Sequence, residues 1–160
     1  MVHIATTAFL NESWSEAAPF SPRPRAPNQT VVVVSGDNDT GGVLAMICEF
    51  LDLQIEHVTD NEDLALLLRM NPPLAVIADL DGGGQDGCHV MKAVATFDRD
   101  LPVMLLTDGN PAYLGAVDAV REAFALTRVA TVKGTDNVGP MVDFLCHATR
   151  DAGVSRMMRL

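Results

Sequence analysis

Five short apolar runs, each followed by a segment with helical spacing of apolar residues, alternate along the chain from residue 31 to residue 152. The first run, Val31 to Val34, is a continuous β-branched stretch of the kind found in strands that are buried on both faces. Alternating strands and helices predict a doubly wound, five-stranded parallel sheet of the α/β class. The predicted strands are 31–34, 55–58, 74–78, 103–106 and 129–132, and the predicted helices are 39–53, 60–70, 89–97, 111–126 and 140–152.

The sequence before residue 30 is distinguished by its prolines, Pro19, Pro22, Pro24 and Pro27. Each proline removes a backbone donor and restrains the residue before it, so this stretch forms neither a helix nor a central strand. We therefore expect residues 1–29 to form a flexible Pro-rich arm. Residues 30–152 are expected to form the domain, and residues 153–160 a C-terminal tail.

The charge balance restricts the class of partner. The 160 residues include 11 basic and 21 acidic side chains, and the net charge of −10 repels phosphate backbones, which argues against a nucleic-acid ligand. No apolar run approaches the roughly 18 residues of a membrane span, so no membrane association is expected. The cysteines, Cys48, Cys88 and Cys146, are in no C-x-x-C spacing and favour a reducing, cytoplasmic location.

Polar side chains end three of the predicted strands. Asp79 follows strand 74–78 and precedes the glycine-rich loop LDGGGQDG, Thr107 follows strand 103–106, and Lys133 follows strand 129–132. The carboxyl ends of parallel strands meet at one edge of a sheet, where ligands collect. A carboxylate before such a loop suits an aspartate that becomes phosphorylated, and a hydroxyl and a cation suit the phosphoryl oxygens. Each residue alone is more simply a turn residue, a cap or a solvated charge, but the three together indicate a phosphoacceptor site.

Over residues 30–150 the chain resembles the receiver domain of two-component response regulators. The family loop Asp-Leu-x-x-Pro-Gly-x-Asp-Gly is matched by DLDGGGQDG, with Gly83 in the proline position. The resemblance implies the flavodoxin-like (βα)5 receiver fold, with Asp79 as phosphoacceptor, Thr107 as switch hydroxyl and Lys133 as partner of the phosphoryl group. It also implies a sensor histidine kinase or another signalling protein as partner, with a homodimer as a further option, and no enzymatic activity beyond autophosphorylation.

The sequence departs from the family at the metal site. Receivers place two adjacent acidic residues after the first strand, where Ser35 and Gly36 stand here. Because Mg²⁺ prefers several oxygen ligands including carboxylates, Asp79 with a serine hydroxyl predicts weak Mg²⁺ binding and weak or absent phosphorylation. Asp37 follows one residue later and is more simply a helix cap. If Asp37 instead completes the metal site, the alternative is a working phosphoacceptor in a phosphorelay.

The sequence also departs from the family at the positions that report phosphorylation to a partner. Lys133 precedes Gly134, where the family usually has proline, and Ala130 occupies the usual aromatic position three residues before the lysine. Without that ring the usual side-chain readout of phosphorylation is missing, which favours an atypical receiver with a constitutive partner face. The predicted partner face consists of residues from two helices. Some of these residues must pack against the sheet and are then not available to a partner. Its residues are Tyr113, Val117, Arg121, Val142, Leu145 and Thr149.

A second resemblance is shorter. Asp79-Leu80-Asp81-Gly82 is similar to the first motif of haloacid-dehalogenase-type phosphatases, which implies Asp79 as nucleophile and Asp81 as general acid and base. Those enzymes carry the motif on their first strand and a further acidic pair beyond the lysine, and this sequence shows neither feature. A phosphatase is therefore the less favoured alternative.

Overall fold

The computed structural model describes residues 29–35, 38–59, 61–80, 87–134 and 136–158. The strands are β1 (Thr30–Val34), β2 (Gln54–Val58), β3 (Ala75–Asp79), β4 (Val103–Thr107) and β5 (Val129–Lys133). The helices are α2 (Asn38–Phe50), α3 (Asn61–Met70), α4 (Gly87–Phe97), α5 (Pro111–Ala123) and α6 (Val138–Met158). The sheet is parallel throughout with the order β2-β1-β3-β4-β5, which confirms the predicted doubly wound, five-stranded architecture.

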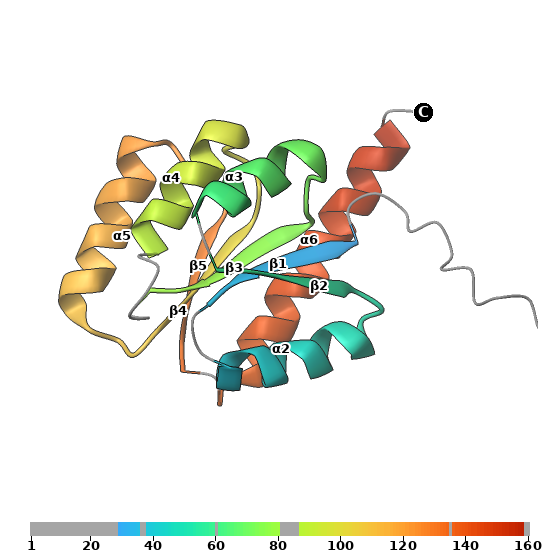
Figure 1. The fold of residues 1–160 in the computed structure, drawn as a ribbon, viewed down its shortest axis with the longest axis horizontal. Coiled ribbons are helices and arrows are strands. Elements are labelled where there is room, and N and C mark those ends of the chain that lie inside the picture. The colour runs from blue at the N-terminus through green and yellow to red at the C-terminus, as the bar shows by residue number, and fades with distance from the viewer. Residues whose placement is uncertain (1–28, 36–37, 60, 81–86, 135, 159–160) are drawn as a thin grey trace, which may run out of the picture.

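The helices cover both faces of the sheet, with α3, α4 and α5 on one side and α2 and α6 on the other (Figure 1). Alternate residues of β1 supply the two cores, because successive strand side chains point to opposite faces. Val32 and Val34 pack in the core beneath α3, α4 and α5. Val31 and Val33 pack in the core beneath α2 and α6. The continuous valine run is therefore buried on both faces, as predicted.

Helix α2 ends at Phe50, and the prediction that it continues to residue 53 is wrong. Asp52 adopts a left-handed φ of 56°, and the Leu53 amide donates to the Cys48 carbonyl at 2.8 Å. This arrangement reverses the chain at the helix end and returns Leu53 to the core. Because Leu53 is apolar and buried, the spacing of apolar residues does not distinguish it from a residue of the helix.

Helix α5 ends in the same way at Ala123, so its predicted end at residue 126 is also wrong. Ala125 has a φ of 52°, and the Leu126 amide donates to the Arg121 carbonyl at 3.0 Å. The start of α5 agrees with the prediction, since Pro111 occupies the first turn. The Asn110 side chain caps this end by accepting from the Ala112 amide at 3.0 Å.

Helix α6 continues to Met158, beyond the predicted end at residue 152, and so includes most of the segment expected to be a tail. It also begins before Pro140, which lies in the first turn, where a missing backbone donor costs little. Among the described residues, no helix is both long and apolar enough to span a bilayer.

Cys48 lies in the core beneath α2 and is 1% exposed. Burial raises the pKa of its thiol from 9.0 to about 11. Because the thiolate is the reactive species, we expect iodoacetamide to modify Cys48 at least about 100-fold more slowly than Cys146 at pH 8. The folded state retains this proton above pH 9, so the contribution of Cys48 to stability should fall as the pH rises from 9.0 through about 11. Peptide mass spectrometry over a time course measures the two labelling rates, and equal rates would contradict the prediction.

Candidate functional site

The register of the sheet brings the predicted site residues to its carboxyl edge. Val34 of β1 pairs with Ala78 of β3, so the next residues, Ser35 and Asp79, lie side by side. On the other half of the sheet, Thr107 of β4 pairs directly with Lys133 of β5. The predicted phosphoacceptor, hydroxyl and lysine are therefore at the same end of three neighbouring strands.

Asp79 is the last residue of β3 and is partly buried. The Ser35 hydroxyl donates a hydrogen bond to Oδ2 of Asp79. The sequence predicted that Ser35 stands in a metal-ligand position, but it did not predict this contact, which depends on strand register. A serine hydroxyl is neutral, so it stabilises the carboxylate by a hydrogen bond and adds no charge that could hold a cation.

Thr107 is 6% exposed at the end of β4. Its Oγ1 accepts a hydrogen bond from the Gly109 amide at 3.0 Å, which fixes the start of the following loop. Gly109 has a φ of 95°, and a Cβ at this position would lie 3.2 Å from Cε of Lys133. The Lys133 side chain therefore lies along the loop after β4, in a path that requires glycine at position 109.

Gly134 explains one departure from the family sequence. It has a φ of 72°, and its amide donates to the Thr107 carbonyl at 3.0 Å. Proline is locked near a φ of about −65° and has no N–H, so it fits neither feature. Gly134 thus hydrogen-bonds the end of β5 to the end of β4, at a position where receivers usually have a proline.

Magnesium is the ion that the resemblance implies. Within the described ranges, no three His, Cys, Asp or Glu side chains form a group that could hold a metal. Ser35 and Asp79 offer one hydroxyl and one carboxylate that bond to each other, which does not fit the oxygen-rich octahedral set that Mg²⁺ prefers. Gly36, Asp37 and Asp81 lie outside the described residues, so the metal role considered for Asp37 stays a prediction.

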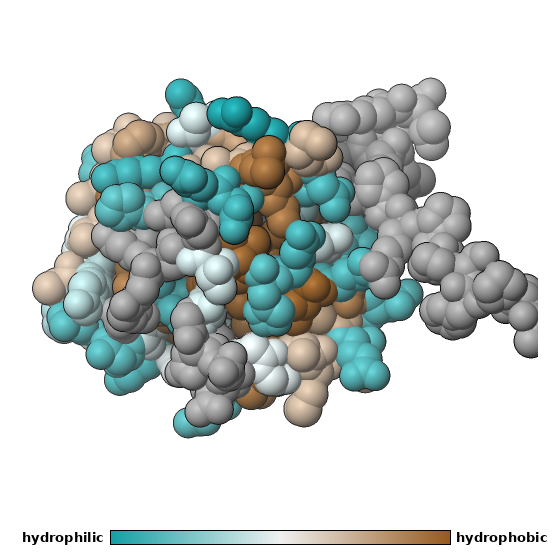
Figure 2. All heavy atoms as spheres, viewed as in Figure 1, coloured by the Kyte–Doolittle hydropathy of each residue, from teal (hydrophilic) through white to brown (hydrophobic). Residues whose placement is uncertain are grey.

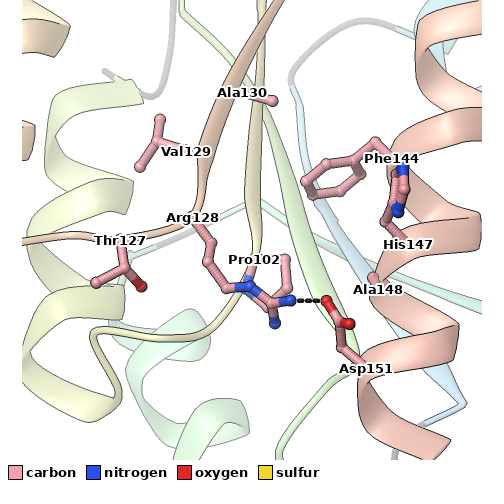
Figure 3. Close-up of a pocket in the computed structure, with 9 residues that line it drawn as sticks. All are labelled: Pro102, Thr127, Arg128, Val129, Ala130, Phe144, His147, Ala148 and Asp151. Carbon is pink, nitrogen blue, oxygen red and sulfur yellow. Dashed lines mark ion pairs between the residues drawn. The ribbon is translucent and has the colours of Figure 1, made fainter. Parts of the chain in front are cut away.

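A pocket of about 180 Å³ lies between β5 and α6, at the position where the resemblance expects an aromatic ring. Ala130 lines it from β5 and Phe144 from α6, on opposite sides in Figure 3. Arg128 and Asp151 form an ion pair at the same site. The aromatic ring of Phe144, which lines this pocket, thus comes from a helix and not from the strand. The sequence analysis missed the pocket, although the helical spacing of Phe144, His147 and Asp151 was its available signal.

The structure separates the six residues predicted for a partner face. Val117 and Leu145 are buried in the core, which confirms that some members pack against the sheet. Tyr113 is 44% exposed, and Arg121 and Thr149 are also exposed. Val142 is half-buried. The exposed members of the face are therefore Tyr113, Arg121 and Thr149.

No known family model matches the sequence, and no curated protein matches it. Solved structures do match the fold. The signal receiver domain of an HD domain-containing protein from Pseudomonas fluorescens Pf-5 superposes with a TM-score of 0.64 at 15% identity, over 79% of this chain and 97% of that chain. A response regulator receiver protein from Pseudoalteromonas atlantica gives 0.63 at 10% identity, over 77% and 98%. The N-terminal domain of a response regulator/sensory box/GGDEF protein from Carboxydothermus hydrogenoformans gives 0.62 at 18% identity, over 79% and 98%.

This chain has the receiver fold. The likeness covers almost the whole of each of those domains and 77–79% of this chain. At these identities it establishes the architecture and leaves the chemistry of the site to be argued from the residues themselves. In a receiver fold the carboxyl edge that holds Asp79, Thr107 and Lys133 is the natural place for that chemistry.

Proposed function

We propose that this protein is an atypical single-domain receiver that acts in two-component signal transduction through protein–protein contacts. In this proposal phosphorylation of Asp79 is weak or absent. The observation that carries it is the hydrogen bond from Ser35 to Asp79, because Ser35 occupies one of the two positions at which receivers have metal-binding acidic residues. The same carboxylate that would attack the phosphodonor is thereby bonded to a neutral hydroxyl.

Phosphoryl transfer to Asp79 would form a bond between a carboxylate oxygen and phosphorus while the donor's bond to phosphorus breaks, a P–N bond in a phosphohistidine or a P–O bond in acetyl phosphate. Negative charge on the phosphoryl oxygens must be neutralised in the transition state, usually by a metal ion. Lys133 supplies one positive charge at this edge, and the Thr107 side chain supplies a hydroxyl. Loss of a major electrostatic stabiliser commonly costs about 100- to 1000-fold in rate, so we expect the reaction to be slow.

The proposed partners are a sensor histidine kinase or another signalling protein, with a second copy of the chain as a further option. The exposed residues Tyr113, Arg121 and Thr149 offer a mixed aromatic and charged surface for such contacts. Ala130 has no ring that could change position when Asp79 is phosphorylated. This supports a partner face whose shape does not depend on phosphorylation. The acidic net charge of −10 supports a protein that does not bind nucleic acid. The free cysteines Cys48, Cys88 and Cys146 support a reducing, cytoplasmic location.

A phosphorelay receiver is the second candidate, because Thr107 and Lys133 are placed at the strand ends as that function requires. Asp37 would then have to supply the second metal-binding carboxylate. The phosphatase interpretation has less support, since two strand-helix units precede the strand that carries Asp79.

The test is incubation with acetyl phosphate and Mg²⁺, followed by intact-mass measurement. Phosphorylation adds about 80 Da. We expect no more than a few per cent of the protein to gain this mass under conditions that phosphorylate a typical receiver, because the charge on the transferred group is poorly neutralised. Asp79→Asn is the control that assigns any gain to this side chain. Near-complete addition that Asp79→Asn abolishes would favour the phosphorelay candidate.

A further inference from the structure

The sheet ends on one side at β2, which pairs with β1 alone among the described strands. The Gln54 amide donates to the Gln29 carbonyl at 2.9 Å, so Gln54 and Glu56 direct their backbone groups toward β1. Because these groups alternate along a strand, the N–H and C=O of Ile55 and His57 face the open side. An edge of this kind is a template for another strand.

A groove of about 410 Å³ follows this edge between β2 and α3. Its helix wall includes Leu66 and Met70, which are 61% and 78% exposed. Figure 2 shows apolar atoms gathered on the face where α3 lies above β2. Burial of large apolar side chains by a partner is favourable, because it removes their surface from water. An open strand edge beside such a wall therefore suits an extended peptide.

The two faces of β2 have different surroundings. Glu56 lies on the α3 side, because it pairs with Val32, whose side chain belongs to the core beneath that helix. His57 lies on the α2 side, where its Cε1 is 3.2 Å from the position that a Cβ would take at Gly41. The side chains of an added strand alternate between the same two faces. Every second side chain of that strand would therefore lie at the groove.

The charge of the groove distinguishes between possible occupants. Its acidic lining residues are Glu56 and Asp63, and both are exposed. Among the described residues that line it, there is no lysine or arginine. A second copy of this chain, with its net charge of −10, would bring the same carboxylates to the edge, and like charges repel across an interface. Basic side chains are attracted instead, and their methylene groups can pack on an apolar wall.

We propose that the open edge of β2 is a docking site for an extended segment of another protein, which carries basic and apolar side chains on one face. The segment adds to the sheet as a further strand and exchanges backbone hydrogen bonds with Ile55 and His57. Its apolar side chains cover the wall that contains Leu66 and Met70, and its basic side chains reach the two carboxylates of the groove. Docking at this edge involves none of the residues described at the Asp79 site.

Amide hydrogen exchange of Ile55 and His57, followed by NMR on the full chain, tests this docking. The probe is the synthetic peptide acetyl-TKTITKT-amide, whose lysines and isoleucine share one face of an extended strand. In a large excess of this peptide we expect both amides to exchange at least about tenfold more slowly, because each becomes hydrogen-bonded. The Val76 amide already donates to the Pro102 carbonyl and should not change.

Modified peptides test the mode of binding. N-methylation of the two lysines and the isoleucine removes the backbone donors of one edge of the peptide, and N-methylation of the threonines removes those of the other edge. One of these two peptides should lose the protection and the other should keep it, since only one edge of an added strand faces β2. The charge-reversed peptide acetyl-TETITET-amide should give no protection.

Protein variants test the groove. Leu66→Gln with Met70→Gln removes the apolar wall without a change of charge, and Glu56→Gln with Asp63→Asn removes the two carboxylates. Each double variant should raise the Kd for acetyl-TKTITKT-amide at least about tenfold. All four side chains are exposed, so these substitutions should leave the fold intact. Asp118→Asn removes an exposed carboxylate of α5 outside the groove, and as the matched control it should leave the Kd nearly unchanged.

Four results would overturn the proposal. The first is unchanged exchange of Ile55 and His57 in excess peptide. The second is the same result, loss or retention, for both N-methylated peptides. The third is an unchanged Kd in both double variants. The fourth is protection of the two amides in the protein without peptide, which would assign the edge to the chain itself or, if it increases with protein concentration, to a second copy.

Discussion

The double substitution Ser35→Asp with Gly36→Asp is expected to raise the rate of Asp79 phosphorylation by acetyl phosphate and Mg²⁺ about 100-fold. It returns two acidic residues to the positions that receivers use for the metal. It also removes the hydroxyl that donates to Asp79. A bound cation would neutralise charge on the transferred phosphoryl group, while Thr107 and Lys133 are already at the neighbouring strand ends. The rate is measured as the gain of phosphoryl mass over time.

Two controls make this prediction specific. The gain should vanish when EDTA replaces Mg²⁺, and it should vanish when Asp79→Asn is added to the double variant. Ser35→Ala removes the hydroxyl without adding charge, so it should leave the rate within a few-fold of the natural protein. An unchanged rate in a correctly folded double variant would show that the loss of reactivity lies elsewhere in the site.

Gly87→Ala is expected to destabilise the fold by about 2 kcal/mol, because it forces a methyl group into a packed position. Gly87 is buried at the first residue of α4. A Cβ there would lie 3.1 Å from the Leu80 Cα, 3.0 Å from Leu80 Cδ1 and 3.4 Å from Leu105 Cδ2. The backbone of Leu80 is held by a hydrogen bond to the Leu106 carbonyl at 2.7 Å, so it cannot move away cheaply. The melting temperature should fall by roughly 4–8 °C.

The matched control is Gly115→Ala in α5. Apart from its chain neighbours and the backbone of its own helix, no atom of the described residues lies within 4 Å of a Cβ at this position. Because alanine is favoured over glycine in a helix interior, this variant should gain about 0.5–1 kcal/mol and melt slightly higher. Thermal unfolding followed by circular dichroism compares the two variants. A Gly87→Ala protein that melts at or above the natural temperature would show that the entry to α4 is less tightly packed than described.

The strands could be predicted closely because their signal is local. Each β-branched or apolar run must be buried, and β1, β3 and β4 are buried along most of their length. The ends of α2 and α5 could not be predicted in this way. Asp52 and Ala125 are not glycines, yet both take the left-handed conformation that ends a helix. Apolar spacing does not distinguish the leucine that follows such a residue from a helical one.

The candidate site was predictable in part. Asp79, Thr107 and Lys133 follow from the rule that strand ends collect chemistry, and the structure puts them at one edge. The bond between Ser35 and Asp79 depends on the registration of β1 against β3, across more than 40 residues of sequence. Contacts of this kind require the folded sheet. The path of Lys133 along Gly109 is unpredictable for the same reason.

The turn at Gly134 constrains which residue can follow Lys133. Its left-handed φ and its amide bond to Thr107 make glycine the residue that the present loop accepts. Gly134→Pro would not fit this turn, because proline there loses the bond and cannot adopt the backbone angle. The hydrogen bond from the Gly134 amide to the Thr107 carbonyl links the loop after β5 to the end of β4. A proline could therefore be accepted after Lys133 only if the backbone at both strand ends took another conformation.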